Sequence, residues 1–208
     1  MKEEFKPEYN IPMLREHQKK RRRERIFKAA LALFRERGFQ ATTASDIAKA
    51  AHVSRGTFFN YFPYKEAVLL DYGSQLLSGL KEEALRRLAR GEPRLEVLKW
   101  LWDELAEGTM REKDLLTPLF YELLNPDPLR AKAAFEALPL GDFLAELLAP
   151  LRKEGRVRQD LSLERIGRTL ADLYFLTALR WAAYTPEKDL KGEMRKTLSL
   201  FLEGALAR

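Results

Sequence analysis

The sequence predicts an all-α protein, and three features of its composition lead to that prediction. Leu, Ala, Arg and Glu dominate the 208 residues, and these residue types favour helices. The 11 Gly and 10 Pro residues are sparse and fall mainly between segments of helical periodicity, where they end helices. Hydrophobic residues make up 46% of the chain and charged residues 33%, a balance that builds a core and does not fit a disordered chain.

The composition also excludes several chemistries. The chain has no Cys, so it forms no disulfides and holds no thiolate nucleophile. We expect no membrane span, because no run of about 18 apolar residues occurs. The first ten residues lack the apolar stretch of a signal peptide, so we expect a cytoplasmic protein. The absence of Cys, the scarcity of Asn and Gln and the abundance of Arg and Glu are typical of a thermophile.

Positive charge is concentrated at the N-terminal end. Residues 1–65 hold 15 Lys and Arg against 7 Asp and Glu, a net charge of +8, whereas the remainder holds 22 against 24, a net charge of −2. A concentrated positive field is typical of a surface that binds a polyanion. The alternative is that basic segments only keep the protein soluble.

The N-terminal third predicts three helices after a short arm. Residues 1–14 contain Pro7 and Pro12 without periodicity and are expected to form a flexible arm. A helix then runs to the stop signal Gly38, with an apolar stripe that includes Ile26 and Phe34. Two shorter helices follow, each beginning at a capping residue. The expected organisation is an arm over residues 1–14, one domain over residues 15–65 and a second over residues 66–208.

The caps of the two short helices can be read from the sequence. Thr43 followed by Asp46 resembles a capping box, with Asp in place of the usual Glu. Ser54 caps the next helix, over residues 54–61, and Pro63 prevents that helix from continuing. Longer helices are expected over residues 65–90, 93–107, 111–124, 129–138, 141–153, 162–184 and 187–207.

Two short helices joined by a tight turn, after a longer one, form a helix-turn-helix unit, whose second helix enters the major groove of DNA. Phe58 and Phe62 recur at helical spacing and are expected to face the core. The polar side of the same helix is then free to meet DNA. It presents Ser54, Arg55, Gly56, Thr57, Asn60 and Tyr61.

Each of these residue types suits one kind of DNA contact. Arg55 fits guanine through two hydrogen bonds, and the methyl group of Thr57 fits the thymine methyl group. Asn60 suits adenine or phosphate, and Tyr61 and Lys65 suit phosphate. The basic run over residues 19–25 precedes this unit. It is either an arm that follows the DNA backbone or a solvated helix face.

The segment from Gly38 to Leu69 resembles the DNA-binding region of TetR-family transcriptional regulators. The resemblance covers residues 26–70 and implies that Thr43 lies near the DNA backbone and that Arg55 and Thr57 contact bases. It also implies that Asn60, Tyr61 and Lys65 contact backbone or bases. Two positions depart from the family pattern. His52 stands where the family most often has Gly and must adopt a positive φ angle, and Phe59 stands where a Tyr hydroxyl often binds phosphate.

The remaining helices are expected to form a dimer and a ligand site. The last two are apolar on two sides, which predicts a homodimer that pairs them with their copies from a second subunit. The alternative is that both fill only their own core. Large aromatic residues recur along the second domain, and a pocket lined by them would take a small hydrophobic or amphipathic effector. The alternative for each of these residues is core packing. The candidate lining residues are Trp102, Phe120, Tyr121, Phe143, Tyr174 and Trp181.

Together these patterns predict a dimeric regulator that binds double-stranded DNA at a palindromic operator. A repressor released by a fatty-acyl compound, an aromatic or a drug is the principal interpretation, and a ligand-free architectural DNA-binding protein is the alternative. We expect no enzyme, no cofactor and no metal site. The chain has only two His residues, one in the basic arm and one in the turn, and no Gly-rich phosphate loop.

Overall fold

A computed structural model describes residues 11–205, and the all-α prediction is confirmed within that range. Ten helices and no strand occur in the described residues. The chain divides into two compact units, residues 1–68 and residues 69–208. Most of the predicted flexible arm lies outside the described residues, and its last four residues, 11–14, belong to the first helix instead.

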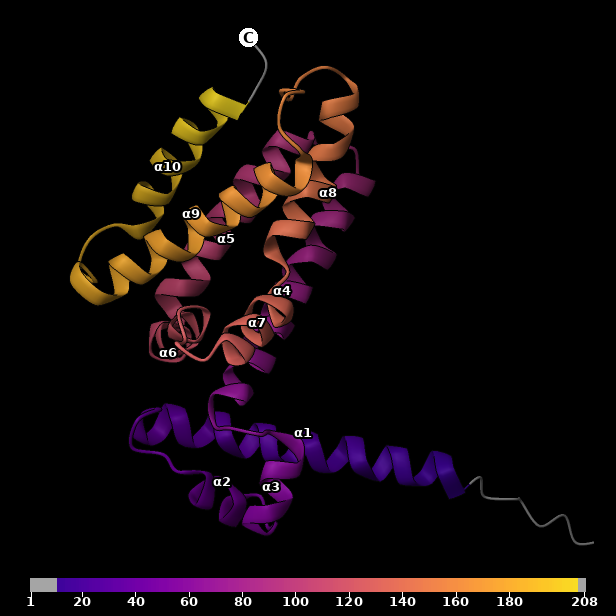
Figure 1. Cartoon of the computed structure of the whole chain (residues 1–208), viewed down its shortest axis with the longest axis vertical. Coiled ribbons are helices and arrows are strands. Elements are labelled where there is room, and N and C mark those ends of the chain that lie inside the picture. The colour runs from indigo at the N-terminus through magenta and orange to yellow at the C-terminus, as the bar shows by residue number, and fades with distance from the viewer. Residues whose placement is uncertain (1–10, 206–208) are drawn as a thin grey trace, which may run out of the picture. The chain divides into compact units, whose positions relative to one another are not determined.

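The first unit holds helices α1 (Ile11–Arg37), α2 (Ala44–Ala50) and α3 (Arg55–Tyr61), shown in indigo to purple in Figure 1. Its core is built by apolar side chains from all three helices and the segment that follows α3. The largest fully buried ones are Ile26, Phe34, Ile47, Phe58 and Phe62. The apolar stripe predicted for the first helix and the inward direction of Phe58 and Phe62 are therefore confirmed.

Helix α4 (Glu66–Ala89) begins in the first unit and continues into the second. The second unit also contains α5 (Arg94–Arg111), α6 (Lys113–Leu123), α7 (Pro128–Ala137), α8 (Leu140–Lys153), α9 (Leu163–Tyr184) and α10 (Leu190–Ala205). Two glycines explain the close packing of α8 and α9. A Cβ on Gly141 would lie 3.1 Å from the Arg168 backbone, and one on Gly167 would collide with the Gly141 carbonyl.

One predicted helix boundary is wrong. The segment Glu107–Met110 was expected to separate two helices, but α5 continues through it to Arg111. The Thr109 side chain satisfies the Leu105 carbonyl at 2.8 Å, and the Glu112 N–H bonds the Gly108 carbonyl at 2.9 Å. A glycine without a positive φ angle does not end a helix when the next turn is hydrogen-bonded. Gly108 is therefore a helical residue of α5.

Helices α9 and α10 pack side by side as an antiparallel pair (Figure 1). Most apolar residues that suggested a dimer surface are buried inside this one chain, among them Ile166, Leu170, Leu190, Met194 and Leu198. Other large apolar side chains face outward from the same two helices. Leu176, Tyr184 and Leu200 are 56%, 78% and 74% exposed. No helix among the described residues is long and apolar enough to cross a membrane.

Candidate functional site

The start of α3 is held by its N-cap. Ser54 has an extended backbone, and its hydroxyl accepts a hydrogen bond from the Thr57 N–H at 3.0 Å. The same oxygen lies 2.8 Å from the Thr57 hydroxyl, so the two side chains fix one another. Capping of this kind satisfies an N–H group that has no partner within the helix. The predicted cap is confirmed, and it sets the direction in which the first turn of α3 presents its residues.

The start of α2 carries the predicted capping box. The Asp46 N–H bonds the Thr43 hydroxyl at 3.1 Å, and the Asp46 carboxylate accepts from the Thr43 N–H at 2.9 Å. A side-chain hydrogen bond from Thr43, then its backbone N–H, lowers the pKa of Asp46. Asp can replace Glu in this box because the carboxylate still reaches back across one turn.

The turn between α2 and α3 is closed by backbone hydrogen bonds. The Val53 N–H reaches the Ala48 carbonyl at 2.9 Å, and the His52 N–H reaches the Lys49 carbonyl at 3.1 Å. His52 has a φ angle of 51°, as the sequence required. It is the one non-glycine residue with positive φ in the described part of the chain. The cost of this conformation is small enough for the turn to tolerate a side chain where Gly is usual.

The predicted DNA-contact residues are brought together around α2 and α3. Thr43, Ser54, Arg55, Gly56 and Asn60 are exposed, and Thr57, Tyr61 and Lys65 are half-buried. The guanidinium carbon of Arg55 lies 5.6 Å from the centre of the Phe59 ring, which is 38% exposed. The Phe59 ring thus supports the Arg55 side chain at this surface, because a cation is attracted to an aromatic face. Residues 19–25 of α1 are all exposed.

Lys65 makes contacts that the sequence did not reveal. Its ammonium group donates to the Phe39 carbonyl at 2.7 Å and to the Thr42 carbonyl at 2.9 Å, and it lies 4.0 Å from the centre of the Phe39 ring. Burial lowers its pKa, against the raising effect of Glu66. Two of its three N–H donors therefore hold the segment between α1 and α2 in place. Contact between Lys65 and a phosphate remains a prediction.

The second unit contains an apolar cavity of about 290 Å³. Its walls come from α4, α5, α6 and α9, with Leu138 from the segment that connects α7 and α8 and Leu140 from the start of α8. The apolar lining residues are Leu76, Leu77, Leu80, Leu105, Leu116, Leu119, Phe120, Leu138, Leu140 and Phe175, and polar groups are few. A mostly apolar cavity with a few polar groups is the usual form of a small-molecule site.

The buried end of the cavity carries one hydrogen-bonded pair. Tyr174 on α9 and Thr109 on α5 have hydroxyl oxygens 2.8 Å apart, and the Thr109 hydroxyl donates to the Leu105 carbonyl at 2.8 Å. Because the one Thr109 proton is used there, the Tyr174 hydroxyl is the donor between them. Burial raises the pKa of Tyr174 to about 12, although the hydrogen bond with Thr109 acts in the opposite direction. Tyr174 is therefore neutral at physiological pH, and its proton is already engaged.

Two of the six predicted ligand-binding residues line this cavity, namely Phe120 and Tyr174. Four lie elsewhere. Trp102 and Trp181 are buried, and their indole N–H groups donate to the carbonyls of Met194 and Lys188 at 2.8 and 2.7 Å. Phe143 is buried in the core with Lys81 5.2 Å from its ring centre, and Tyr121 is 53% exposed. A helix buried on two sides does not reveal from its sequence which side faces a cavity, so the sequence did not distinguish these four aromatic residues from those that line it.

Several cavity residues were not singled out from the sequence. Thr109 forms the polar pair, and Gly79 and Gly108 line the cavity from α4 and α5. A signal for the two glycines was present, since Gly is unfavourable within a helix unless its lack of a side chain is needed. A second hollow of about 760 Å³ between α5 and α10 is lined mainly by charged and polar residues, so it is a poorer site for a hydrophobic ligand.

Two family descriptions match the chain. Residues 26–72 match "Bacterial regulatory proteins, tetR family", and residues 74–204 match "TetR/AcrR family transcriptional repressors, C-terminal domain". The two matches follow one another along the chain and together include both the α2–α3 surface and the cavity.

Individual relatives agree with these matches. The HTH-type transcriptional regulator YvdT of Bacillus subtilis is 27% identical over 183 residues, 88% of this chain and 94% of the relative. The crystal structure of Thermus thermophilus FadR, a TetR-family transcriptional repressor in complex with lauroyl-CoA, has a TM-score of 0.86 and 73% identity. It covers 89% of this chain and 96% of the FadR chain. FadR of Bacillus subtilis in complex with stearoyl-CoA has a TM-score of 0.70 at 20% identity, over 87% and 98% of the two chains, and shows a similar fold.

Proposed function

The chain belongs to the TetR family of transcriptional regulators, and from this premise we propose that it is a cytoplasmic repressor released from its operator by a fatty acyl-CoA. The family matches cover residues 26–72 and 74–204. Proteins of this family regulate transcription and are not enzymes, which agrees with the sequence-based expectations on both points. The operator, the dimer and the ligand are the new parts of the proposal.

The first unit reads the operator through α3. Arg55 and Thr57 meet base edges from the first turn of this helix, while Asn60 and Tyr61 meet bases or phosphates. The Ser54 cap supports this assignment, because it fixes Thr57 and leaves Arg55 exposed on the same turn. The basic residues 19–25 add phosphate contacts that do not depend on base sequence.

A dimer places two copies of α3 on the two halves of a palindrome. Half-sites for such dimers lie about 34 Å apart or a multiple of that distance. The outward apolar side chains of α9 and α10, Leu176, Tyr184 and Leu200, support dimerisation through these helices. Their exposure would be unfavourable in a monomer, and pairing with a second copy removes them from water.

The cavity of the second unit takes the acyl chain. The mostly apolar walls of the cavity are the observation that supports this proposal. A saturated hydrocarbon chain has no hydrogen-bonding group, so it can be buried against such walls without losing a hydrogen bond. At the buried end, the Tyr174 proton is already donated to Thr109, so a carboxylate placed there would find no free donor from this pair. The 73% identity with FadR of Thermus thermophilus, which binds lauroyl-CoA, supports an acyl thioester as the ligand.

The ligand and the operator are linked through α4, which starts in the DNA-binding unit and lines the cavity in the second unit. If the acyl chain binds better to an arrangement of α4 that fits the operator poorly, each ligand weakens the other. A coupling free energy of about 1–3 kcal/mol changes the affinity roughly 5- to 150-fold, which is sufficient for a switch.

The test begins with selection of bound fragments from random duplex DNA, and the enriched fragment then serves as the probe. Lauroyl-CoA is titrated into the protein–DNA complex while fluorescence anisotropy is recorded, with free CoA and free laurate as controls. The expected result is a palindromic fragment that lauroyl-CoA alone releases. Sequence-specific binding that none of the three compounds alters would contradict the ligand-controlled repressor. It would favour the ligand-free architectural protein.

A further inference from the structure

The exposed residues that line the cavity belong to α4 and α5. The exposed lining residues are Gln75 and Gly79 on α4 and Arg111 on α5, while Gly108 and Glu104 of α5 are half-buried. Gln75 and Gly79 are four residues apart, as are Glu104 and Gly108, so each pair lies on one face of its helix. Thr109 and Tyr174, whose hydroxyl groups are hydrogen-bonded to each other, also line the cavity and are buried.

Gly79 and Gly108 have no packing partner that explains them. A Cβ built on either residue would meet nothing within 4 Å. Gly73, which also lines the cavity, is different, because its Cβ would lie 2.5 Å from Leu119 Cδ1. Glycine is the least favourable helical residue apart from proline. These two positions therefore weaken α4 and α5 without any gain in packing within the chain.

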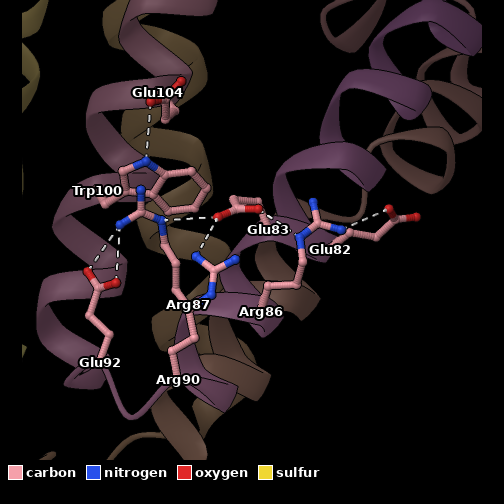
Figure 2. A network of polar contacts seen from close by, with 8 residues as sticks. All are labelled: Glu82, Glu83, Arg86, Arg87, Arg90, Glu92, Trp100 and Glu104. Atoms are coloured by element: carbon pink, nitrogen blue, oxygen red, sulfur yellow. Dashed lines mark hydrogen bonds and ion pairs between the residues drawn. The ribbon is translucent and has the colours of Figure 1, made fainter.

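A polar network joins the C-terminal part of α4 to α5 (Figure 2). The Arg87 guanidinium of α4 lies 4.3 Å from the centre of the Trp100 ring on α5 and also pairs with Glu92 at 3.1 Å. Trp100 donates its indole N–H to Glu104 at 3.2 Å, and Glu104 lines the cavity. Gly79 and Arg87 are eight residues apart, so they lie just over two turns apart along α4 and about 80° apart around its axis.

We propose that Gly79 and Gly108 form the gap through which the acyl chain enters the cavity, with its width set by their missing side chains. The network around Arg87 and Trp100 holds the two helices at a defined distance, so neither helix closes the gap. Side chains at positions 79 and 108 would narrow it without disturbing the core, because both positions face open space. This inference rests on the proposed function, since it identifies how the same ligand reaches the same site.

The experiment compares Gly79→Leu and Gly108→Leu with Ser78→Leu. Ser78 is the exposed neighbour of Gly79 on α4 and does not line the cavity, so it adds the same side chain to the same helix outside the entrance. The dissociation constant for lauroyl-CoA is measured by calorimetry, and melting is followed by circular dichroism. We expect both glycine variants to bind lauroyl-CoA roughly tenfold or more weakly than the control. Their melting temperatures should be unchanged or raised.

If either leucine variant has a lowered melting temperature, the alanine variants at both positions test the proposal in a folded protein. Gly79→Ala and Gly108→Ala should melt at or above the wild-type temperature, because alanine favours helices, and should still bind lauroyl-CoA a few-fold more weakly. Equal affinities for lauroyl-CoA in the wild type, the control and the glycine variants would contradict the proposed entrance but not the proposed acyl-CoA ligand. Failure of the wild type itself to bind lauroyl-CoA would overturn the proposed ligand, and with it the entrance.

Discussion

Replacing Tyr174 with Phe tests the buried end of the cavity, because the change removes one hydroxyl group and keeps the ring. The ring contacts with Trp102, Phe120 and Phe175 remain, with centroid distances of 6.0, 6.1 and 5.1 Å. The Thr109 hydroxyl also keeps its bond to the Leu105 carbonyl. The substitution thus isolates the hydrogen bond from Tyr174 to Thr109 and the ionisation of the phenol.

Two effects of opposite sign determine how Tyr174→Phe changes the free energy of unfolding. Loss of the hydrogen bond should lower the free energy of unfolding by about 1 kcal/mol at neutral pH. The pKa of Tyr174 is raised from 10.0 to about 12 in the folded protein. A phenol with a raised pKa favours folding below its unfolded pKa, and this contribution is lost as the pH rises from about 10 to 12. At about pH 11 the loss for the wild type is roughly 1.4 kcal/mol, approaching about 2.7 kcal/mol once both states are ionised.

The assay is urea unfolding of both proteins between pH 8 and about pH 12. Tryptophan fluorescence is the suitable probe, because Trp100, Trp102 and Trp181 all belong to the second unit. Lys and Arg titrate equally in both proteins, so the difference in unfolding free energy isolates Tyr174. The wild type should be more stable at pH 8, and the two stability curves should cross near about pH 11.

A difference in unfolding free energy between the two proteins that stays constant from pH 8 to about pH 12 would refute this reasoning. It would mean that Tyr174 ionises alike in the folded and unfolded chains, and therefore that its hydroxyl reaches water. Equal stability at pH 8 would refute the hydrogen bond to Thr109.

Three further changes test other parts of the molecule. Arg55→Ala should weaken binding to the selected operator by about 1–3 kcal/mol and relax specificity at one base pair, measured by anisotropy at fixed salt; a uniform loss over all sequences would instead make Arg55 a phosphate contact. Lys65→Met should destabilise the first unit by about 1–3 kcal/mol, since two carbonyls lose their donor; hydrogen exchange of α1–α3 amides measures this, and unchanged protection would argue against the contact. Gly73→Ala should destabilise the second unit by about 1–3 kcal/mol through collision with Leu119; a variant that melts at the wild-type temperature would show that Leu119 moves aside freely.

The DNA-binding unit could be predicted in detail because its signals are local. The capping box of Thr43 and Asp46, the Ser54 cap and the positive φ angle of His52 each depend on residues within one turn of one another. Such interactions are decided by neighbouring residues, so the chain order alone specifies them. Phe58 and Phe62 were placed in the core for the same reason, since helical spacing fixes the face on which they lie.

The cavity could not be predicted to the same degree. Trp102, Phe120 and Tyr174 are all large aromatic residues on helices, and all three are buried. Only the tertiary packing makes Phe120 and Tyr174 cavity walls and turns the Trp102 indole toward the Met194 carbonyl. Thr109 illustrates the limit most clearly, because its partner Tyr174 is 65 residues away along the chain.

The sequence by itself thus determined the helical class, the family and the local geometry around α2 and α3, since these depend on composition and on spacings of a few residues. The tertiary structure decided where the cavity lies, which glycines line it and where Lys65 directs its donors. These features depend on helices that meet after long separations in sequence. A helix that is apolar on two sides carries no local mark of which side will face a neighbour and which will face a ligand.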